Sequence, residues 1–219
     1  MSKSKRSILS RLWYELLCRL LQLIAVLAYG IRFSGRENIP ATGGVLVVSN
    51  HQSHLDPPMV GIGSPRRLNF LARESLFHFA PFRKLLQSLE VIPLDVEGKG
   101  ISGMKESLRR LKRGEPVMIF PEGSRTHDGR IAPFMSGFTA LAVRSGAAIQ
   151  PAAIDGAFQA WPRHHLFPRL GKIRVHFGAP LTPEEIAALD DRALLAEVER
   201  RVHDCFAQCR GRRLGRRQA

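Results

Sequence analysis

The chain has 219 residues, of which 44% are hydrophobic and 24% are charged. These values are ordinary for a globular domain, so they exclude a disordered chain, a collagen-like repeat and a polytopic membrane protein. The length predicts a single domain, with room for one helical appendage.

The formal net charge of +14 is concentrated at the two ends of the chain. Residues 1–11 and 210–219 contain nine lysines and arginines and no acidic residue, so the rest of the chain carries only +5. Such ends predict contact with an anionic membrane surface, with nucleic acid and plain solvated tails as alternatives. Because no aromatic residue interrupts the arginines of 210–217, base stacking has little to act on, and we expect no nucleic-acid partner.

Three cysteines, Cys18, Cys205 and Cys209, cannot all be paired with one another. None of them has a second cysteine or a histidine at the spacing of a zinc finger. We therefore expect a reducing compartment and no metal site.

The first element is a predicted helix from Ser10 to Tyr29. Its polar residues form one stripe, and the other positions are almost all apolar, a wider apolar face than a small domain buries. The uncharged run between Arg19 and Arg32 has 12 residues, whereas a spanning helix needs about 20. Residues 1–34 are therefore predicted to be an amphipathic anchor in the membrane interface. A signal peptide and an ordinary core helix are the alternatives.

After Gly35, short apolar runs alternate with amphipathic stretches, which is typical of alternating strands and helices. The predicted strands are Val45–Val48, Leu68–Ala72, Leu89–Leu94, Val117–Phe120, Ile149–Ile154 and Ile173–Phe177. The predicted helices are Pro57–Gly61, Pro81–Ser88, Ser102–Arg113, Ser136–Ser145 and a last one that starts at a Thr182 capping box and reaches Phe206. The pattern predicts one α/β domain over residues 35–209, with a mixed central sheet flanked by helices, and a basic tail at 210–219.

A histidine and an aspartate follow the strand predicted at Val45–Val48. His51 and Asp56 are five residues apart, so they cannot share one helical face and the chain must turn between them. Asp56 before Pro57 predicts a helix N-cap. The turn would bring the carboxylate to one imidazole nitrogen and leave the other nitrogen free to take a proton from a hydroxyl. A capping aspartate and a merely packed histidine are the alternative.

A second polar loop, Pro121–Thr126, follows the strand predicted at Val117–Phe120, at a strand end where α/β sheets usually bind ligands. Glu122 offers hydrogen-bond acceptors for a polyol, Gly123 permits a close backbone approach, and Arg125 offers a fork for a phosphate. A polar turn with one exposed ion pair is the alternative.

Together these residues resemble the glycerolipid acyltransferases typified by 1-acyl-glycerol-3-phosphate (lysophosphatidate) acyltransferases. The run Asn50–Asp56 matches the family's H-x4-D motif, and Phe120–Thr126 matches its F-P-E-G-[ST]-R motif. Phe70–Leu76 resembles the opening of the family's second motif, and Ile149–Ile154 resembles its fourth. The similarity covers about residues 35–180.

The resemblance implies that His51, oriented by Asp56, deprotonates the free hydroxyl of a lysophospholipid. The hydroxyl then attacks the thioester of acyl-CoA or of acyl carrier protein directly, with no metal and no other cofactor. The implied acceptor is 1-acyl-sn-glycerol-3-phosphate, which becomes phosphatidate. The implied location is the cytoplasmic side of an anionic membrane surface, as a monotopic or peripheral protein.

The same resemblance implies the substrate-binding residues. Glu122 and Gly123 would position the acceptor's glycerol, Ser124 belongs to the same loop, and Arg125 would hold the phosphate. One position departs from the family, because Val96 stands where its second motif commonly ends in an arginine. We include Arg73 as the substitute, with Lys84 and Lys99 as alternatives.

Other functions have weaker support. Gly98–Gly103 spells a G-x-G-x-x-G pattern, but Asp95 and Glu97 beside it would repel a pyrophosphate. The sequence contains no G-x-S-x-G, the usual signature of a serine hydrolase. Acyl transfer to a different lysolipid or an amino-lipid, and a non-catalytic membrane-surface binding module, remain as alternatives.

Overall fold

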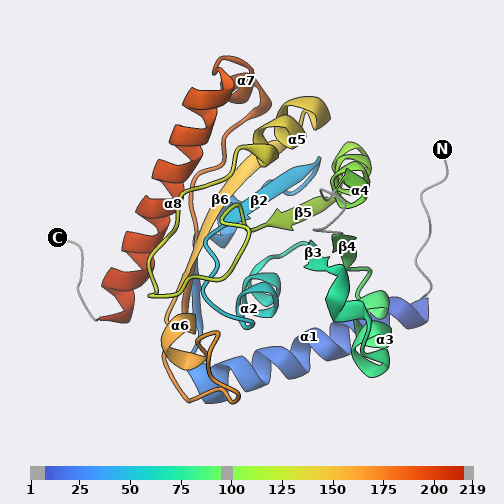
Figure 1. Ribbon diagram of the computed structural model, residues 1–219, viewed down its shortest axis with the longest axis vertical. Helices are drawn as coiled ribbons and strands as arrows, with labels where there is room; N and C mark the ends of the chain where they lie inside the picture. The colour runs from blue at the N-terminus through green and yellow to red at the C-terminus, as the bar shows by residue number, and fades with distance from the viewer. Residues whose placement is uncertain (1–7, 95–100, 215–219) are drawn as a thin grey trace.

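The computed structural model of the protein describes residues 8–94 and 101–214 (Figure 1). Seven strands form one sheet in the order β1-β7-β6-β2-β5-β3-β4. Neighbouring strands are parallel except β6 and β7, so the predicted mixed sheet is confirmed. The strands are β1 (Arg32–Ser34), β2 (Val45–Ser49), β3 (Asn69–Arg73), β4 (Ile92–Leu94), β5 (Pro116–Ile119), β6 (Ala148–Asp155) and β7 (Arg174–Phe177).

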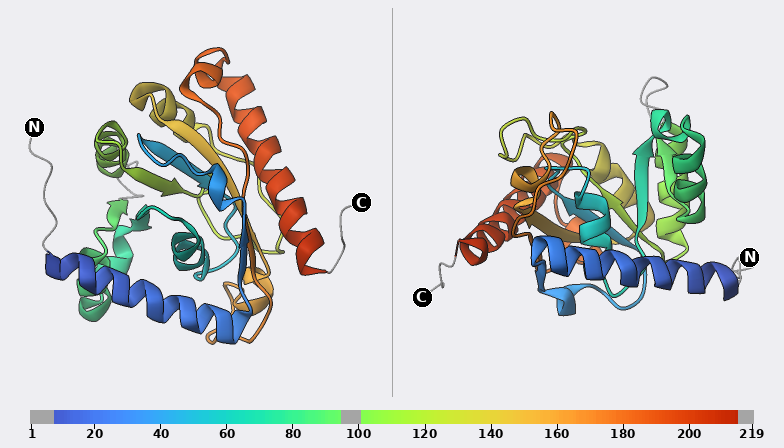
Figure 2. Two further views of the ribbon diagram at one scale, coloured as in Figure 1. Left: turned by 180° about the vertical axis from the view of Figure 1, so that it is seen from behind. Right: turned by 90° about the horizontal axis from the view of Figure 1, so that it is seen from below.

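Helices cover both faces of the sheet (Figures 1 and 2). α1 (Ile8–Tyr29) and α2 (Asp56–Gly63) pack on one face. The other face is covered by α4 (Ile101–Lys112), α5 (Gly137–Ser145), α7 (Pro183–Ala187) and α8 (Asp191–Arg213). The remaining helical pieces are η1 (Arg36–Asn38), η2 (Glu74–Phe77), α3 (Ala80–Ser88) and α6 (Ala157–Ala160).

The central strand β2 shows why this sequence folds in three layers. Val45 and Val47 belong to the core formed with α1 and α2, whereas Leu46 and Val48 belong to the core formed with α4, α5 and α8. All four side chains are fully buried. A parallel strand covered on both faces is apolar throughout, which explains the unbroken run in the sequence.

Five strands end at one edge of the sheet. β2, β3, β4, β5 and β6 are mutually parallel in the ladder, so their carboxyl ends lie at the same edge. The two motif loops follow β2 and β5, which are direct neighbours. The topology therefore brings together the two motifs that lie far apart in the sequence.

The C-terminal helix differs from its prediction as one continuous helix. The predicted capping box is present at the start of α7, because Thr182 and Glu185 each accept a hydrogen bond from the other's backbone amide. The chain then leaves the helix and restarts as α8 behind Asp190, whose carboxylate accepts from the amide of Ala193. In one continuous helix, this amide would donate to a backbone carbonyl of the preceding turn. The Asp190 side chain replaces that carbonyl, so a new helix begins here.

Two predicted segment boundaries also shift. β1 pairs with β7, so residues 32–34 of the predicted anchor belong to the sheet. α8 continues to Arg213, so the first residues of the predicted basic tail are helical. Arg213 forms an ion pair with the buried Asp155, which fixes the end of this helix to β6.

α1 leaves a broad apolar surface exposed. The window Leu12–Tyr29 has a mean hydropathy of 1.5 over 18 residues, long and apolar enough for a membrane span by those two criteria, and 11% of it is buried. A core helix is mostly buried, so this exposure disfavours the core-helix alternative. Ala25 and Tyr29 near the end of the helix are buried and fix it to the domain. The orientation of α1 in a membrane stays a prediction.

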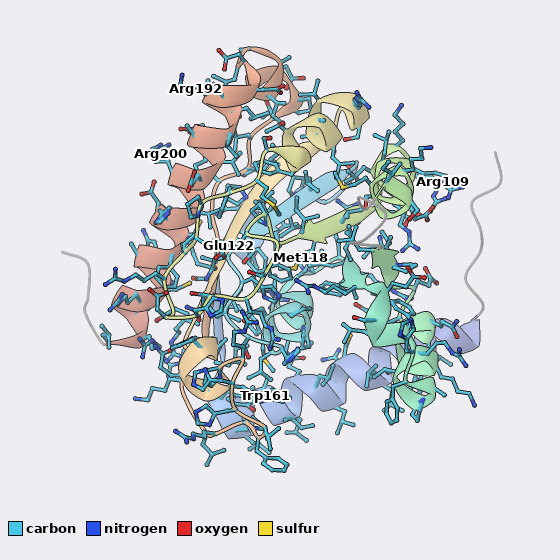
Figure 3. All side chains as sticks on the ribbon, viewed as in Figure 1. Arg109, Met118, Glu122, Trp161, Arg192 and Arg200 are labelled. Atoms are coloured by element: carbon cyan, nitrogen blue, oxygen red, sulfur yellow. The ribbon has the colours of Figure 1, made fainter. Side chains whose placement is uncertain are left out.

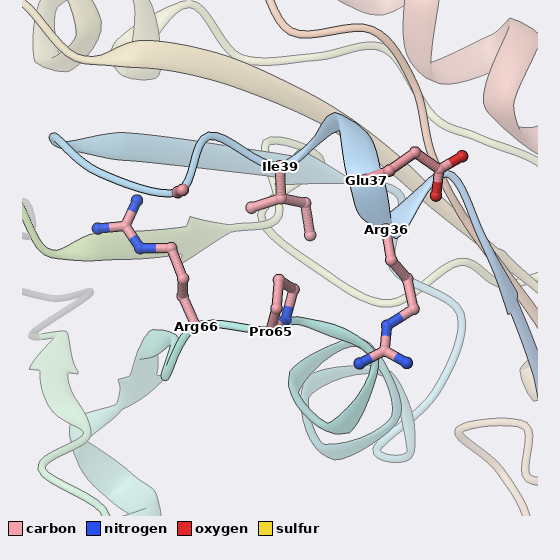
Figure 4. Close-up of a pocket in the computed structure, with 6 residues that line it drawn as sticks. Arg36, Glu37, Ile39, Pro65 and Arg66 are labelled. Atoms are coloured by element: carbon pink, nitrogen blue, oxygen red, sulfur yellow. The ribbon is translucent and has the colours of Figure 1, made fainter.

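At the opposite edge of the sheet, Arg66 ties together the segments that lead into three strands. Its guanidinium donates hydrogen bonds of 2.7 to 2.9 Å to three backbone carbonyls, those of Pro40, Gly43 and Gly114. It borders a hollow of about 540 Å³ that Ile39 and Pro65 also line (Figure 4). Because its donors are bonded to the backbone, Arg66 has a structural role in this hollow.

We expect Arg66→Ala to lower the free energy of unfolding by about 2–3 kcal/mol, because three carbonyls lose a charged donor together. Urea denaturation followed by circular dichroism measures this change. Arg192→Ala, which removes an exposed arginine of α8, is the matched control and should stay within about 0.5 kcal/mol of the parent protein. Equal stabilities of the two variants would contradict the assignment.

Candidate active site

The Asp56 carboxylate organises the loop between β2 and α2. Its Oδ2 atom accepts hydrogen bonds from His51 Nδ1 at 2.7 Å and from the backbone amides of Gln52 and Ser53. The carboxylate therefore turns back to the histidine, as the spacing predicts. The predicted N-cap role is wrong, because Asp56 is the first residue of α2, no side chain caps the helix, and the carboxylate is bonded to the loop.

The buried position of Asp56 gives this pair its chemical character. The aspartate is fully buried, and a buried charge is tolerated only when hydrogen bonds replace its lost water. The carboxylate can only accept, so His51 donates its Nδ1 proton to it, and an unprotonated imidazole in this position carries its lone pair on Nε2. Nε2 makes no hydrogen bond to any residue in the described part of the chain. It is therefore available to a substrate hydroxyl.

The second motif loop holds His51 in place. The imidazole stacks on Phe120 with ring centroids 4.0 Å apart, and the side chain is 19% exposed. The His51 amide donates to Glu122 Oε1 at 2.6 Å, and its carbonyl accepts from the Thr126 amide at 2.8 Å. The two motifs thus form one interlocked unit.

β6 and the segment after it hold the first loop from the other side. The Asn50 side chain accepts from the amide of Ile154 and donates to its carbonyl, at 2.9 and 3.0 Å. The Ser53 hydroxyl donates to the Trp161 carbonyl at 2.7 Å. No local sequence pattern predicts a role for Asn50 or Ser53, because their partners lie about a hundred residues away in the chain.

Glu122 is a positioning residue by its contacts. Its second oxygen, Oε2, accepts from the Ala132 amide at 2.8 Å, so both oxygens are bonded to backbone amides. Burial raises the pKa of this carboxyl, and the two amide hydrogen bonds oppose the rise. Figure 3 labels Glu122 in the middle of the molecule as viewed there. The geometry therefore favours support of His51 over the predicted contact with the acceptor's glycerol.

Gly123 and Ser124 form the exposed turn of the second loop. Gly123 has φ 69°, a left-handed backbone conformation that favours glycine, whereas a Cβ there would meet only the flexible end of the Met135 side chain, at 2.4 Å. Ser124 is exposed and hydrogen-bonds to none of the described residues. Their contact with the acceptor stays a prediction.

Three arginines from three segments gather around this loop. Arg73, the last residue of β3, donates to the Gly123 carbonyl at 3.3 Å. Arg163 contacts His127 Nε2 at 2.7 Å. Arg125 belongs to the loop itself, and its Nη1 atom is buried without a hydrogen-bond partner.

The arginine cluster of Arg73, Arg125 and Arg163 lacks counter-charges. Within the two described ranges, none of the three forms an ion pair with a carboxylate. Burial, and then the positive charge of Arg163, lower the pKa of the Arg125 guanidinium, while Asp56 opposes this shift. Crowded cations without carboxylate partners favour the binding of an anion such as a phosphate.

Some site residues could not be found from the sequence. The sequence patterns indicate no function for Arg163 or His127. Val96 lies outside the described residues, as does the first part of the G-x-G-x-x-G pattern. Gly103, which ends that pattern, is buried in α4, where a Cβ would meet the Pro93 carbonyl at 3.0 Å.

Among the described side chains, no group of three His, Cys, Asp or Glu is placed to hold a metal ion.

Comparison with known proteins identifies the family. The family model called Acyltransferase matches residues 30–155, more than half of the chain and both motif loops. The chain belongs to the acyltransferase family. The predicted resemblance to glycerolipid acyltransferases is confirmed. Arg163 lies outside the range that the family model matches.

Named relatives agree with this membership. The 1-acyl-sn-glycerol-3-phosphate acyltransferase of Bacillus subtilis is 30% identical over 186 residues, which cover 84% of this chain and 90% of the relative. That of Pseudomonas aeruginosa is 31% identical over 190 residues, which cover 83% and 72%. The crystal structure of the 1-acyl-sn-glycerophosphate (LPA) acyltransferase PlsC from Thermotoga maritima superposes with a TM-score of 0.74 at 22% identity, covering 94% of this acyltransferase and 82% of that chain. This last likeness shows a shared fold.

We expect Glu122→Gln to lower kcat by about 10- to 100-fold with a smaller change in KM, because an amide cannot accept from both backbone N–H groups and one of them loses its partner. Steady-state kinetics of acyl transfer measure the split. Glu199→Gln on α8 is the matched control and should leave both constants unchanged. A variant that raised KM and kept kcat would instead support the direct acceptor contact.

Proposed function

We propose that this acyltransferase moves a fatty acyl chain from a thioester to the free hydroxyl of 1-acyl-sn-glycerol-3-phosphate, giving phosphatidate. The observation that carries the proposal is the pair of His51 and Asp56 beside the arginine cluster. The first can act as a base for a hydroxyl, and the second can bind a phosphate. The names of the Bacillus and Pseudomonas relatives support the same acceptor.

In the proposed reaction, His51 is the general base and Asp56 holds its ring. The acceptor hydroxyl gives its proton to Nε2 while its oxygen attacks the carbonyl carbon of the thioester. The new C–O bond forms, the C–S bond breaks, and the leaving thiolate takes the proton back from the imidazolium. The Asp56 carboxylate stabilises the imidazolium between these steps. The reaction needs no acyl-enzyme, metal or other cofactor, and its donor is acyl-CoA or acyl carrier protein.

The acceptor's phosphate binds to Arg125 in this proposal. Arg73 and Arg163 lie against the loop that carries Arg125 and contribute the charge that an arginine at position 96 would supply. A guanidinium presents two parallel donors to a phosphate, which suits the unbonded Nη1 of Arg125.

We also propose that the enzyme works at the cytoplasmic face of the membrane, with α1 in the interface. The acceptor and the product are both bilayer lipids, so a surface-bound enzyme meets them without extracting them. The thiols of Cys205 and Cys209 are free and buried, which fits a reducing compartment.

The experiment that tests the function measures thiol release from an acyl thioester by the purified protein with lysophosphatidate, other lysolipids and an amino-lipid. We expect transfer to lysophosphatidate, and a fall in kcat of about 10²- to 10⁴-fold in His51→Ala, because the general base is lost. Asp56→Asn should also lower kcat, because a neutral amide stabilises the imidazolium poorly. His203→Ala, on the exposed side of α8, is the control.

The outcomes separate the alternatives. Full transfer by His51→Ala would exclude the histidine as the base. Transfer only to another acceptor would keep the base and reject lysophosphatidate. Absence of transfer to every acceptor would reject the proposal in favour of a membrane-surface binding module.

We expect Arg163→Ala to raise the KM for lysophosphatidate by about 10-fold or more, because a positive charge beside the bound phosphate is lost. The kinetic constants for 1-monoacylglycerol, which lacks the phosphate, should not change. Arg144→Ala on α5 removes the same charge from a remote exposed position and is the control. An equal loss with both acceptors would show that Arg163 only supports the loop.

A further inference from the structure

The loop of residues 162–170, between α6 and β7, presents the three most exposed large apolar side chains of the described residues. Leu166 is 86% exposed, Leu170 82% and Phe167 79%. Exposed leucine and phenylalanine side chains that cluster on one short loop are a sign of a contact surface. The acyl-transfer chemistry uses none of them.

Hydrogen bonds give this loop a defined shape. The Arg169 amide donates to the Ala160 carbonyl at 2.7 Å, and the Trp161 indole donates to the His165 carbonyl at 2.8 Å. The loop is thus closed at its base, while its apolar side chains point away from the core. Holding apolar side chains in water costs free energy. Burying them against a partner surface removes that cost.

The loop lies next to the end of α1. The amides of Gly171 and Ile173 donate to the carbonyls of Ala28 and Tyr29 at 3.3 and 3.0 Å. α1 and this loop lie on the same side of the molecule (Figure 2). Trp161, at the base of the loop, is labelled in Figure 3. The exposed apolar side chains of α1 extend the same surface over an arc of about 160° of the helix. They are Leu12, Trp13, Leu16, Leu20, Leu23, Ile24, Val26 and Leu27.

The charge around the loop selects its partner. No acidic residue occurs between Asp155 and Glu184, whereas Arg163, Arg169 and Lys172 flank the apolar tip. Apolar side chains ringed by cations complement an anionic bilayer, whose acyl chains take the tip and whose headgroups take the charges. A second copy of this basic protein would bring like charges together.

We propose that residues 162–170 are a second membrane contact, which inserts Leu166, Phe167 and Leu170 into an anionic bilayer beside α1. The base of the loop is bonded to the first motif loop, through Ser53 with Trp161, and to the residue directly after the second, through His127 with Arg163. Insertion therefore holds the arginine cluster at headgroup depth, where the phosphate of a lysolipid lies. The contact does not depend on which acceptor the enzyme uses.

The test compares the full-length protein with the double variant Leu166→Ser/Phe167→Ser in sedimentation with vesicles of phosphatidylcholine containing about 30% phosphatidylglycerol, without substrate. We expect the partition coefficient to fall about 10-fold or more, because two large apolar side chains leave the bilayer. Ile101→Ser/Val143→Ser is the matched control, since these side chains are 53% and 54% exposed on α4 and α5, across the sheet from α1. Equal partition of both double variants would overturn the proposal.

Two further readouts separate membrane insertion from misfolding and from self-association. Acyl transfer to a short-chain lysolipid below its micelle concentration should be the same in the loop variant and the parent, which shows that the variant folds and that vesicle binding is what changed. If the parent were a dimer in solution and the loop variant a monomer with unchanged vesicle partition, the surface would be an interface between copies and the proposal would be wrong.

Insertion depth gives an independent check. In a Trp13→Phe background, which removes the tryptophan of α1 from the signal, Phe167→Trp should show a blue-shifted and bromolipid-quenched emission component on vesicle binding that the background protein lacks, whereas Val143→Trp should not. Equal quenching of the two variants, or none in Phe167→Trp, would contradict insertion of this loop.

Discussion

The buried carboxylate of Asp56 is the constraint on which the site depends. A fully buried charge without hydrogen bonds would be strongly destabilising, so the loop must direct donors to it. Two of those donors are backbone amides, of Gln52 and Ser53, and the third is the ring of His51. The same interactions that make the burial tolerable also fix the tautomer and the direction of the imidazole. The conformation of the loop and the geometry of the histidine–aspartate pair are therefore one property.

A single aspartate would not hold this arrangement without the second motif. β2 and β5 are parallel neighbours, so their following loops start side by side and interlock through the backbone of His51. Glu122 accepts from that backbone and from Ala132, and the left-handed turn at Gly123 presents the arginine that follows it. The second motif thus has two parts, a carboxylate directed inward and a guanidinium whose Nη1 atom is buried without a hydrogen-bond partner.

The position of the site relative to the membrane follows from the same loops. The 162–170 loop is bonded at its base to the first motif and to the residue directly after the second, and its continuation contacts the end of α1. The helix that the sequence marks as an anchor and the loop that carries exposed leucine and phenylalanine thus lie on one side of the fold. In the proposed function, an enzyme whose acceptor and product are lipids gains from this placement, because membrane contact would bring the arginine cluster to the depth at which lipid phosphates lie.

The sequence by itself determined the features that arise from neighbouring residues. The apolar runs gave the strands β2, β5 and β6, the capping box at Thr182 gave the start of α7, and the five-residue spacing of His51 and Asp56 gave a turn that joins the two side chains. The motifs also indicated the family. Only the tertiary structure decided what depends on distant partners. β1 is three residues long and exists because it pairs with β7, Glu122 meets the amide of His51, and Arg163 meets the loop of Arg125. These contacts join residues tens to more than a hundred positions apart, and a local pattern carries no information about which segments the sheet will place side by side.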